Sequence, residues 1–235
     1  MSTLLPEVTA LFRPAKRPTL REQLHDLWRF TSAVSAWGPN YATWFLGGAS
    51  KAEALMYEAF DQNGVTTAAY AVLRTRNDGS EAADDIGIWN GEDGAKAAGI
   101  GYTLGAEGRP WTVNLRPRVD PLITWQAVAD VVQAAVKAWS PMVVTAFPSS
   151  YFPKKVFKDR PGVGWMLYLP MALTTEQVPE ARALVPVVLG GRVGTIIVSV
   201  IDEQFSDDNP EHVKIANAIE IRLVDQDLLP RYADL

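Results

Sequence analysis

Ser50 is the residue whose surroundings in the sequence come nearest to those of a catalytic group. It lies in Gly48-Ala-Ser-Lys-Ala52, after the apolar run Trp44-Phe-Leu46 and before a predicted helix. A serine between a strand and a helix is typical of the nucleophile elbow of hydrolases, and Asp202 and His212 would complete a triad in the chain order Ser, Asp, His. This elbow requires glycine on both sides of the serine, because its turn is sharp and strained, and the second of these positions holds alanine here.

Capping of a helix is the simpler interpretation of Ser50. Glu53 follows three residues later, which is the spacing of a capping box, in which the two side chains satisfy backbone N–H groups at the start of a helix. We therefore favour a structural role for this serine. A small serine hydrolase that uses Ser50 stands as the alternative function, and loss of ester turnover in Ser50→Ala would distinguish the two.

The sequence lacks the patterns that hold a cofactor or a metal ion. The run from Gly99 to Gly105 has one residue too many for the dinucleotide-binding motif and leads into a predicted strand instead of a helix. No phosphate-binding loop occurs, cysteine is absent, and His25 and His212 are too few for a histidine-based metal site. The acidic residues before the last predicted helix lack the spacing of a calcium-binding loop. We expect no cofactor, no metal and no catalytic site, and we infer that the protein is not an enzyme.

Acidic side chains are concentrated in two segments of a chain whose formal net charge is −5. Residues 81–110 carry six acidic and two basic side chains, and residues 201–235 carry nine and three. A nucleic-acid-binding protein would instead show a basic stripe interleaved with aromatic residues. We therefore expect no nucleic acid as ligand and favour a basic protein partner.

Both acidic segments contain predicted strand ends or helix starts, and binding residues on a rigid scaffold usually lie in the loops at such ends. Trp89 is the binding anchor that we select from eight tryptophans, because it lies among acidic residues and tryptophan is enriched at binding hot spots. The predicted partner-binding residues are Asp84, Asp85, Trp89, Glu92, Asp93, Asp202, Glu203 and Asp207. The hypothesis places both groups on one face of the protein. Asp208 is left out, because capping of the last helix explains it.

The composition is that of a folded protein without a membrane segment. Apolar residues make up 48% of the 235 positions and charged residues 21%, which excludes intrinsic disorder. No apolar stretch approaches the roughly 20 residues that span a bilayer, and the first residues lack the basic and apolar regions of a signal peptide. We expect a cytoplasmic protein that does not contact membranes.

Helices are predicted in the first third of the chain. Thr19 and Glu22 have capping-box spacing at the start of the first helix, which ends before Gly38-Pro39. A second helix is predicted over residues 50–64, and a third, short helix over residues 66–74.

Two blocks, each with strands followed by a helix, make up the remainder. The strands of the first block are predicted at Ile86–Trp89, Ile100–Leu104 and Trp111–Leu115, before a helix over residues 124–139. Those of the second block are predicted at Met142–Phe147, Val163–Leu169, Leu184–Val188 and Val193–Val200, with a hairpin turn at Gly190-Gly191-Arg192 and a last helix from Asp208 to Leu229-Pro230. The predicted fold class is α+β, with N-terminal helices followed by two antiparallel-sheet-then-helix blocks. Residues 1–235 would form a single domain with residues 81–140 and 141–230 as internal halves.

Three segments of the sequence resemble the immunity protein 52 family of bacterial polymorphic-toxin systems. They are Phe30–Leu55, which includes Trp37-Gly38 and Gly47-Gly-Ala-Ser-Lys51, then Gly194–Val200, and finally Asn209–Pro230. The resemblance implies a cognate immunity protein that binds and neutralises a nuclease toxin. Such toxins are typically of the restriction-endonuclease-like class and are often delivered by type VI secretion. The partner implied is therefore a toxin protein, which agrees with an acidic chain that is rich in aromatic residues.

Overall fold

A computed structural model describes residues 6–106, 108–117 and 124–235 of the chain. Contacts between Cα atoms divide the chain into two compact units. Unit 1 comprises Met1–Phe12 and Asp120–Leu235, and unit 2 comprises Arg13–Val119. Each unit contains an antiparallel sheet with a helix on one of its faces.

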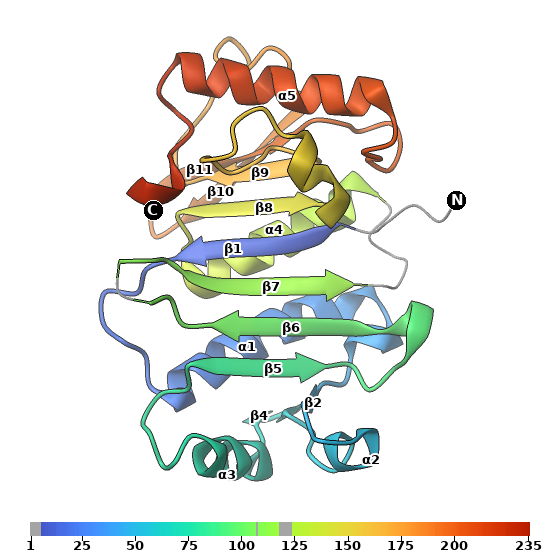
Figure 1. The fold of residues 1–235 in the computed structure, drawn as a ribbon, viewed down its shortest axis with the longest axis vertical. Helices are drawn as coiled ribbons and strands as arrows, with labels where there is room; N and C mark the ends of the chain where they lie inside the picture. Colours follow the sequence, from blue (N-terminus) through green and yellow to red (C-terminus); the bar gives the residue numbers. More distant parts are fainter. Residues whose placement is uncertain (1–5, 107, 118–123) are drawn as a thin grey trace. The chain divides into compact units, whose positions relative to one another are not determined.

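The sheet of unit 2 has the strand order β7-β6-β5-β2 (Figure 1). Its strands are β2 (Phe45–Leu46), β5 (Asp85–Trp89), β6 (Ala98–Thr103) and β7 (Trp111–Pro117). Buried and more exposed residues alternate along β5, β6 and β7, because successive side chains of a strand point to opposite faces. The buried face is formed by Ile86, Ile88, Ile100, Tyr102, Val113 and Leu115.

Helix α1 (Leu20–Val34) covers this buried face and passes behind β5 and β6 in Figure 1. The predicted capping box at its start is confirmed, since Thr19 Oγ1 accepts a hydrogen bond from the N–H of Glu22 and the Glu22 carboxylate accepts one from the N–H of Thr19. Gln23 exchanges two hydrogen bonds of 2.9 Å with the backbone of Ala83 and so fixes α1 to the segment before β5. The apolar side of the helix consists of Leu20, Leu24, Leu27, Phe30 and Val34.

The second predicted helix, over residues 50–64, is wrong beyond its first turn. Helix α2 covers only Lys51–Ala54, and the later residues form a hairpin of β3 (Phe60–Asp61) and β4 (Gly64–Val65). Gly64 has a φ of +126°, which glycine adopts without the steric cost that other residues meet. The glycine that was expected to end a helix therefore begins the second strand of a hairpin, directly after its turn.

The third predicted helix is confirmed as α3 (Thr67–Arg76), and the side chain of Thr66 caps its first turn. Short 3₁₀ turns accompany these elements at η1 (Ser35–Trp37), η2 (Pro39–Tyr41) and η3 (Gly94–Lys96). The buried Trp44 follows η2 and donates its indole N–H to the carbonyl of Tyr41 at 3.0 Å.

The sheet of unit 1 has the strand order β10-β11-β9-β8-β1. Its strands are β1 (Glu7–Phe12), β8 (Val143–Phe147), β9 (Met166–Leu169), β10 (Ala183–Leu189) and β11 (Arg192–Val198). Helix α4 (Trp125–Trp139) packs against β1 and β8, which lie in front of it in Figure 1. The predicted hairpin turn between β10 and β11 is confirmed, because Gly190 and Gly191 have φ values of +55° and +78°, the signs that a type I′ turn needs. In β10, the outermost strand of this order, Pro186 lies opposite Thr195.

A buried carboxylate joins two further elements of unit 1. The two elements are η4 (Ser149–Lys154) and α5 (Pro210–Asp225). The last turn of the chain is η5 (Tyr232–Asp234). Glu220 of α5 is fully buried and accepts hydrogen bonds from the Tyr151 hydroxyl at 2.8 Å, the Val156 N–H at 2.9 Å and the Val163 N–H at 3.1 Å. The segment from η4 to β9 is therefore fixed to α5 by a polar contact inside the unit.

The α+β class is confirmed, but the predicted arrangement of the elements needs correction. A strand that was not predicted, β1, precedes the first helix. Its residues Val8, Ala10 and Phe12 are buried and alternate with more exposed residues, as expected for a strand with one face on the core. Strand β1 also pairs with β8, 132 or more positions later in the chain, as the register from Leu11↔Val143 to Glu7↔Phe147 shows. Helix α4 belongs to the same unit as the later strands, so the division between units falls before α4, whereas the predicted halves meet at residue 140.

The last helix also begins and ends differently from the prediction. Asn209, and not Asp208, is its N-cap, and the Asn209 side chain accepts a hydrogen bond of 3.0 Å from the N–H of Glu211. The helix ends at Asp225, before the predicted end at Leu229-Pro230. Asp208 is an exposed residue of the preceding turn and lies 3.6 Å from the Nζ of Lys154.

Candidate partner-binding site

Trp89 lies at the end of β5, on the exposed face of the sheet of unit 2. Its neighbours across the sheet are Phe45 on β2 and Gly99 on β6. The side chain is partly exposed, but its Nε1–H is buried and has no hydrogen-bond partner within the described residues. The Nζ of Lys51 lies 6.0 Å from the centre of the indole ring, at the limit of cation–π contact. Trp89 therefore offers a partner the partly exposed, apolar part of its ring, a property that binding anchors use.

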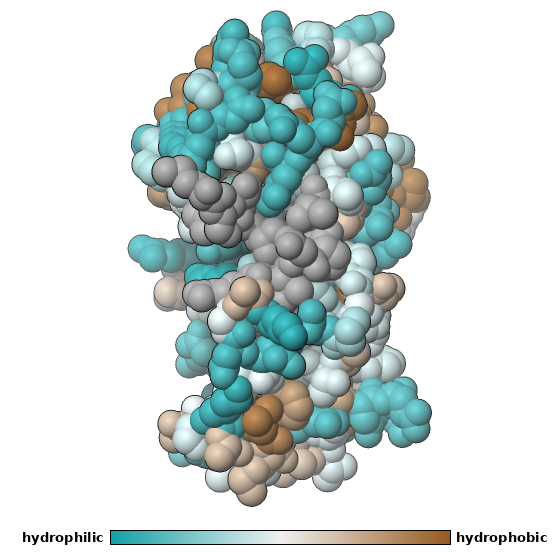
Figure 2. Space-filling view, turned by 90° about the vertical axis from the view of Figure 1, so that its right-hand side faces the viewer, coloured by the Kyte–Doolittle hydropathy of each residue, from teal (hydrophilic) through white to brown (hydrophobic). Residues whose placement is uncertain are grey.

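Apolar side chains surround Trp89 at this end of the sheet. Leu55 and Met56, directly after α2, are 41% and 69% exposed. A methyl group added to Gly91 would lie 2.8 Å from the Phe45 ring and 3.2 Å from the Leu55 side chain, so these two side chains meet over Gly91. We call Phe45, Leu55, Met56 and Trp89 the Trp89 patch. Figure 2 shows hydrophobic surface in the lower part of this side of the protein, in the region of α2.

The predicted acidic residues of unit 2 form two pairs at opposite ends of β5. Asp84 and Asp85 lie at its start, and Glu92 and Asp93 follow its end. All four are exposed. The two pairs are separated by at least the length of β5, about 13 Å at the usual rise of a strand. Only Glu92 and Asp93 therefore adjoin the Trp89 patch.

Two of these four carboxylates are neutralised within unit 2. Asp84 forms an ion pair of 2.7 Å with Arg17, and Asp93 forms one with Lys51. Within the described part of the chain, the other two carboxylates, those of Asp85 and Glu92, form neither an ion pair nor a hydrogen bond. Of the four predicted acidic residues of unit 2, these two are therefore available to a partner without the loss of an internal contact.

The predicted acidic residues of unit 1 lie in the turn between β11 and α5, and they differ in exposure. Asp202 and Glu203 are exposed, whereas Asp207 is only 8% exposed. The Asp207 carboxylate accepts hydrogen bonds from Lys154 Nζ at 2.6 Å and from Ser150 Oγ at 2.9 Å. Burial alone would raise the pKa of the Asp207 carboxyl, but these hydrogen bonds outweigh burial and hold the pKa below its usual value. Asp207 therefore fixes the turn to η4, and the same turn exposes Asp202 and Glu203 to solvent.

His212, in the first turn of α5, orients Glu203. Its Nδ1 accepts a hydrogen bond of 3.0 Å from the N–H of Ser206, so the neutral ring carries its proton on Nε2, which lies 2.9 Å from Glu203 Oε1. The imidazole also stacks on Phe205, with 5.7 Å between the ring centres. Both ring nitrogens are used within unit 1, and neither bonds Asp202. The base of the alternative catalytic triad is therefore engaged in a structural contact.

Ser50 acts as a helix cap. Its Oγ accepts a hydrogen bond of 3.2 Å from the N–H of Glu53, as predicted. The carboxylate of Glu53 accepts a hydrogen bond of 3.1 Å from the N–H of Ala49, so the reciprocal bond of the capping box goes to the residue before the cap. This arrangement accounts for the side chains of Ser50 and Glu53 without catalysis.

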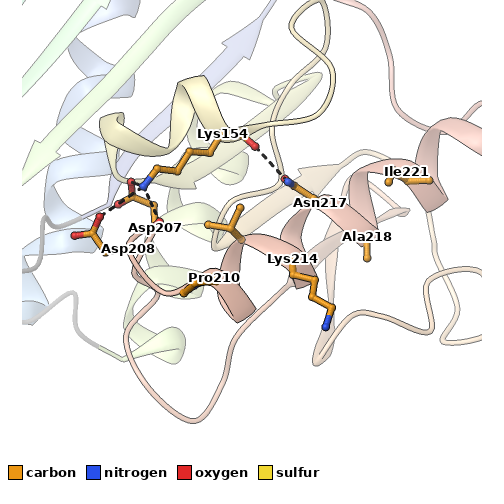
Figure 3. Close-up of a pocket in the computed structure, with 9 residues that line it drawn as sticks. Lys154, Asp207, Asp208, Pro210, Lys214, Asn217, Ala218 and Ile221 are labelled. Carbon is orange, nitrogen blue, oxygen red and sulfur yellow. Dashed lines mark hydrogen bonds and ion pairs between the residues drawn. The ribbon is translucent and has the colours of Figure 1, made fainter.

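A groove of about 630 Å³ runs along α5 in unit 1 (Figure 3). At one end, Lys154 reaches Asp207 and Asp208, and its carbonyl accepts a hydrogen bond of 3.2 Å from Asn217. Farther along the helix the groove is lined by apolar residues such as Ile221, which is 44% exposed. Of the acidic residues predicted to bind a partner, Asp207 is the one that lines this groove, and it is paired with Lys154.

The structure brings some of the predicted residues together and leaves others apart. Trp89, Glu92 and Asp93 are neighbours at one end of β5, whereas the unit 1 residues belong to a separate compact unit. The shared face therefore remains a prediction. Leu55 and Met56 were not among the predicted binding residues, because the predicted helix places Leu55 on an apolar helix face. The run of apolar residues in Ala54-Leu-Met56 was the available signal.

In the ranges 6–106, 108–117 and 124–235, no three His, Asp or Glu side chains are arranged to hold a metal ion. No helix in these ranges combines the length and the apolar character that crossing a lipid bilayer requires.

Comparison with known proteins identifies a family and a similar fold. A family model described as Immunity protein 52 matches residues 15–231 of the chain. Among solved structures, a T6SS protein of Pseudomonas aeruginosa, PA0821, is similar, with a TM-score of 0.55 and 13% sequence identity over 94% of this chain and 72% of that chain. At this identity the likeness concerns the fold. No curated protein matches the sequence.

Proposed function

The chain belongs to the immunity protein 52 family, and on this premise we propose that it is a cognate immunity protein that neutralises a bacterial toxin by stoichiometric protein–protein binding. The match over residues 15–231 carries the proposal, because it includes nearly all of both units. The likeness in fold to a T6SS protein supports a toxin that is delivered by type VI secretion. Neutralisation by binding requires no catalysis, which agrees with the capping role of Ser50.

The toxin that we propose is a nuclease of the restriction-endonuclease-like class. A nuclease must present basic side chains to its polyanionic substrate, and carboxylates of an inhibitor can use the same basic surface. The unpaired carboxylates of Asp85 and Glu92, and the exposed Asp202 and Glu203, support such a partner. Because a nuclease toxin acts on nucleic acid inside the cell, we place the neutralisation in the cytoplasm.

The binding residues that we propose fall into three roles. Trp89 is the anchor, with an exposed apolar surface around it. The acidic residues that guide association are Asp84, Asp85, Glu92, Asp93, Asp202 and Glu203. Asp207 contributes by holding the turn that presents Asp202 and Glu203, through its contacts to Lys154 and Ser150.

Co-expression tests the proposal directly. The toxin encoded beside the gene for this chain should arrest growth of a bacterial host when expressed alone, and growth should recover when this chain is co-expressed. The purified proteins should form a complex of fixed stoichiometry, and titration with this chain should stop DNA cleavage at that ratio. Unchanged DNA cleavage without a complex would contradict the proposal. Ester turnover that is lost in Ser50→Ala would instead support the hydrolase alternative.

A further inference from the structure

We propose that Asn90 is a positioning residue of the toxin-binding surface, because its side chain holds the turn that carries Glu92 next to Trp89. The inference rests on the proposed function and deepens it, since it concerns the same surface. Asn90 directly follows Trp89, the last residue of β5, and a turn over residues 91–97 leads from there to β6. Asn90 is only 6% exposed, whereas residues 92–96 of the turn are all exposed.

The side-chain amide of Asn90 uses its full hydrogen-bonding capacity inside unit 2. Its Oδ1 accepts hydrogen bonds from the N–H of Ala98 at 2.9 Å and from the N–H of Glu92 at 3.3 Å. Its Nδ2 donates to the carbonyl of Lys96 at 2.8 Å and to the carbonyl of Asn40 at 3.0 Å. An asparagine amide has two donors and two acceptor lone pairs, and all four are used here. One buried side chain therefore connects both ends of the turn.

The other contacts within the turn are weaker. Its two internal backbone hydrogen bonds are both 3.3 Å long, which is longer than most N–H···O bonds. Asp93 forms its ion pair with Lys51 through side chains that are 73% and 51% exposed, and such pairs contribute little to stability. The conformation of the turn therefore depends chiefly on the amide of Asn90.

Asn90 also connects the turn to the segment that leads to β2. Asn40, whose carbonyl it binds, lies in η2, and η2 also accepts the indole N–H of the buried Trp44. Trp44 directly precedes Phe45, which lies opposite Trp89 in the sheet. The same amide thus fixes the turn relative to two residues of the Trp89 patch.

The turn carries charges of both signs, so a partner is selected by their positions and not by their sum. Glu92 and Lys96 are exposed and form no ion pair within the described residues, whereas Asp93 is paired with Lys51. Opposite charges at fixed places set the register of a complex and disfavour other partners. A surface that is ordered before association also avoids the entropic cost of ordering it in the complex. Loss of the Asn90 amide should therefore weaken binding without any change of charge.

Removal of the amide tests the inference. Asn90→Ala should lower the melting temperature, and the N–H groups of Glu92 and Ala98 should exchange faster with deuterium, because they lose their acceptor. Binding to the adjacent-gene toxin, made catalytically inactive and measured by surface plasmon resonance, should weaken by about 10-fold or more. The salt dependence of the association rate should remain that of the wild type, because the charges are unchanged.

Thr31→Ala is the control for a general loss of stability. Thr31 is 3% exposed, and its hydroxyl donates a hydrogen bond of 3.0 Å to the carbonyl of Trp28 within α1, on the other side of the sheet from the Trp89 patch. Its removal should lower the melting temperature as well. At a temperature at which both variants are folded, Thr31→Ala should bind the toxin within about 2-fold of the wild type, because the site is distant.

A second pair of variants decides the test if Asn90→Ala does not fold. Gly94 lies in the turn with a φ of +59°, and Gly79 lies in the turn after α3 with a φ of +76°. A methyl group added to either would meet no atom within 4 Å, so valine would strain each exposed turn without removing a buried contact. Gly94→Val should weaken toxin binding by about 5-fold or more, and Gly79→Val should leave it within about 2-fold.

The outcomes separate the inference from the proposed function. Wild-type affinity in a folded Asn90→Ala whose turn exchanges faster, or in Gly94→Val, would overturn the inference and leave the proposed function standing. An equal loss of affinity in Thr31→Ala would also overturn it, because general destabilisation would then explain the effect. A toxin that fails to bind the wild-type chain would instead contradict the proposed function itself.

Discussion

Glu220 accepts a hydrogen bond of 2.8 Å from the hydroxyl of Tyr151, which lies 69 positions earlier in the chain. Burial raises the pKa of the Tyr151 hydroxyl, and the negative charge of Glu220 raises it further, so the hydroxyl remains protonated and acts as donor. The other two partners of Glu220 are backbone N–H groups. The side chain thus accepts at every contact, as an ionised carboxylate does.

Removal of this carboxylate should destabilise unit 1 strongly. Glu220→Ala leaves three donors without their acceptor inside the protein, so we expect a loss of about 3 kcal/mol or more in the free energy of unfolding. Tyr151→Phe removes one hydrogen bond to a charged group and should cost about 2 kcal/mol. Urea unfolding followed by tryptophan fluorescence measures both. Glu211→Ala, at an exposed position of the same helix, is the control and should change stability by less than about 0.5 kcal/mol. Equal stability of Glu220→Ala and the control would contradict this account.

The ion pair of Asp207 should make stability depend on pH. Its carboxyl has a lowered pKa in the folded protein, so the ionised form stabilises the fold above the ordinary value of 3.8, and this contribution disappears as the pH falls through the lowered value. We expect Asp207→Asn to be about 1–2 kcal/mol less stable than the wild type at pH 7. The difference should narrow as the pH is lowered below 3.8. Asp208→Asn, at an exposed position, serves as control; a constant difference for Asp207→Asn between pH 7 and pH 3 would exclude the ion pair as its cause.

Loss of the cap at α2 should affect stability and leave neutralisation intact. Ser50→Ala removes the acceptor for the N–H of Glu53 and should cost about 1 kcal/mol. Thermal unfolding measures this cost, and a toxin co-expression assay measures protection. Ser50→Thr retains a hydroxyl acceptor and should recover most of the stability. An unchanged melting temperature together with lost protection would point to a direct role of Ser50.

Toxin-binding kinetics should distinguish the acidic residues from the anchor. Replacement of rim carboxylates mainly slows association and reduces its salt dependence, so the alanine pairs at Asp84/Asp85, Glu92/Asp93 and Asp202/Glu203 should show this pattern. Trp89→Ala should cost about 2 kcal/mol or more in binding free energy, mostly through faster dissociation. Surface plasmon resonance at low and high salt gives both rates. Wild-type rates for all four folded variants at both salt concentrations would refute the acidic-surface hypothesis.

Local sequence signals predicted most elements of the fold. Thr19 and Glu22 marked the start of α1, and Gly190-Gly191 marked the turn of the β10–β11 hairpin, because in each case neighbouring residues make the deciding contacts. The prediction of a helix over residues 50–64 was wrong, because contacts with residues outside the segment determine its structure. The N–H of Leu46 donates a hydrogen bond to the carbonyl of Tyr57, and the N–H of Ala59 donates one to the carbonyl of Trp44. These contacts draw the segment away from a helix.

The candidate site was less predictable, because it depends on pairing between distant residues. Spacing in the sequence could not show that Asp84 and Asp93 are neutralised by Arg17 and Lys51, 67 and 42 positions away. The same holds for Gly87 and Gly101, which become neighbours only through strand register. Trp89 could be selected as the predicted anchor from the acidic residues that flank it in the sequence, whereas Leu55 and Met56 come from another element.

Pro186 has a consequence for how the protein behaves at high concentration. β10 is the terminal strand of its sheet and is rich in valine and leucine, which is the kind of strand that recruits further strands into aggregates. Proline has no N–H to offer, and within sheets it is found on edge strands with that position turned away from the neighbouring strand. An incoming strand would therefore meet a missing donor in the middle of β10. Proline at this position therefore hinders edge-to-edge association, while β10 keeps its pairing with β11.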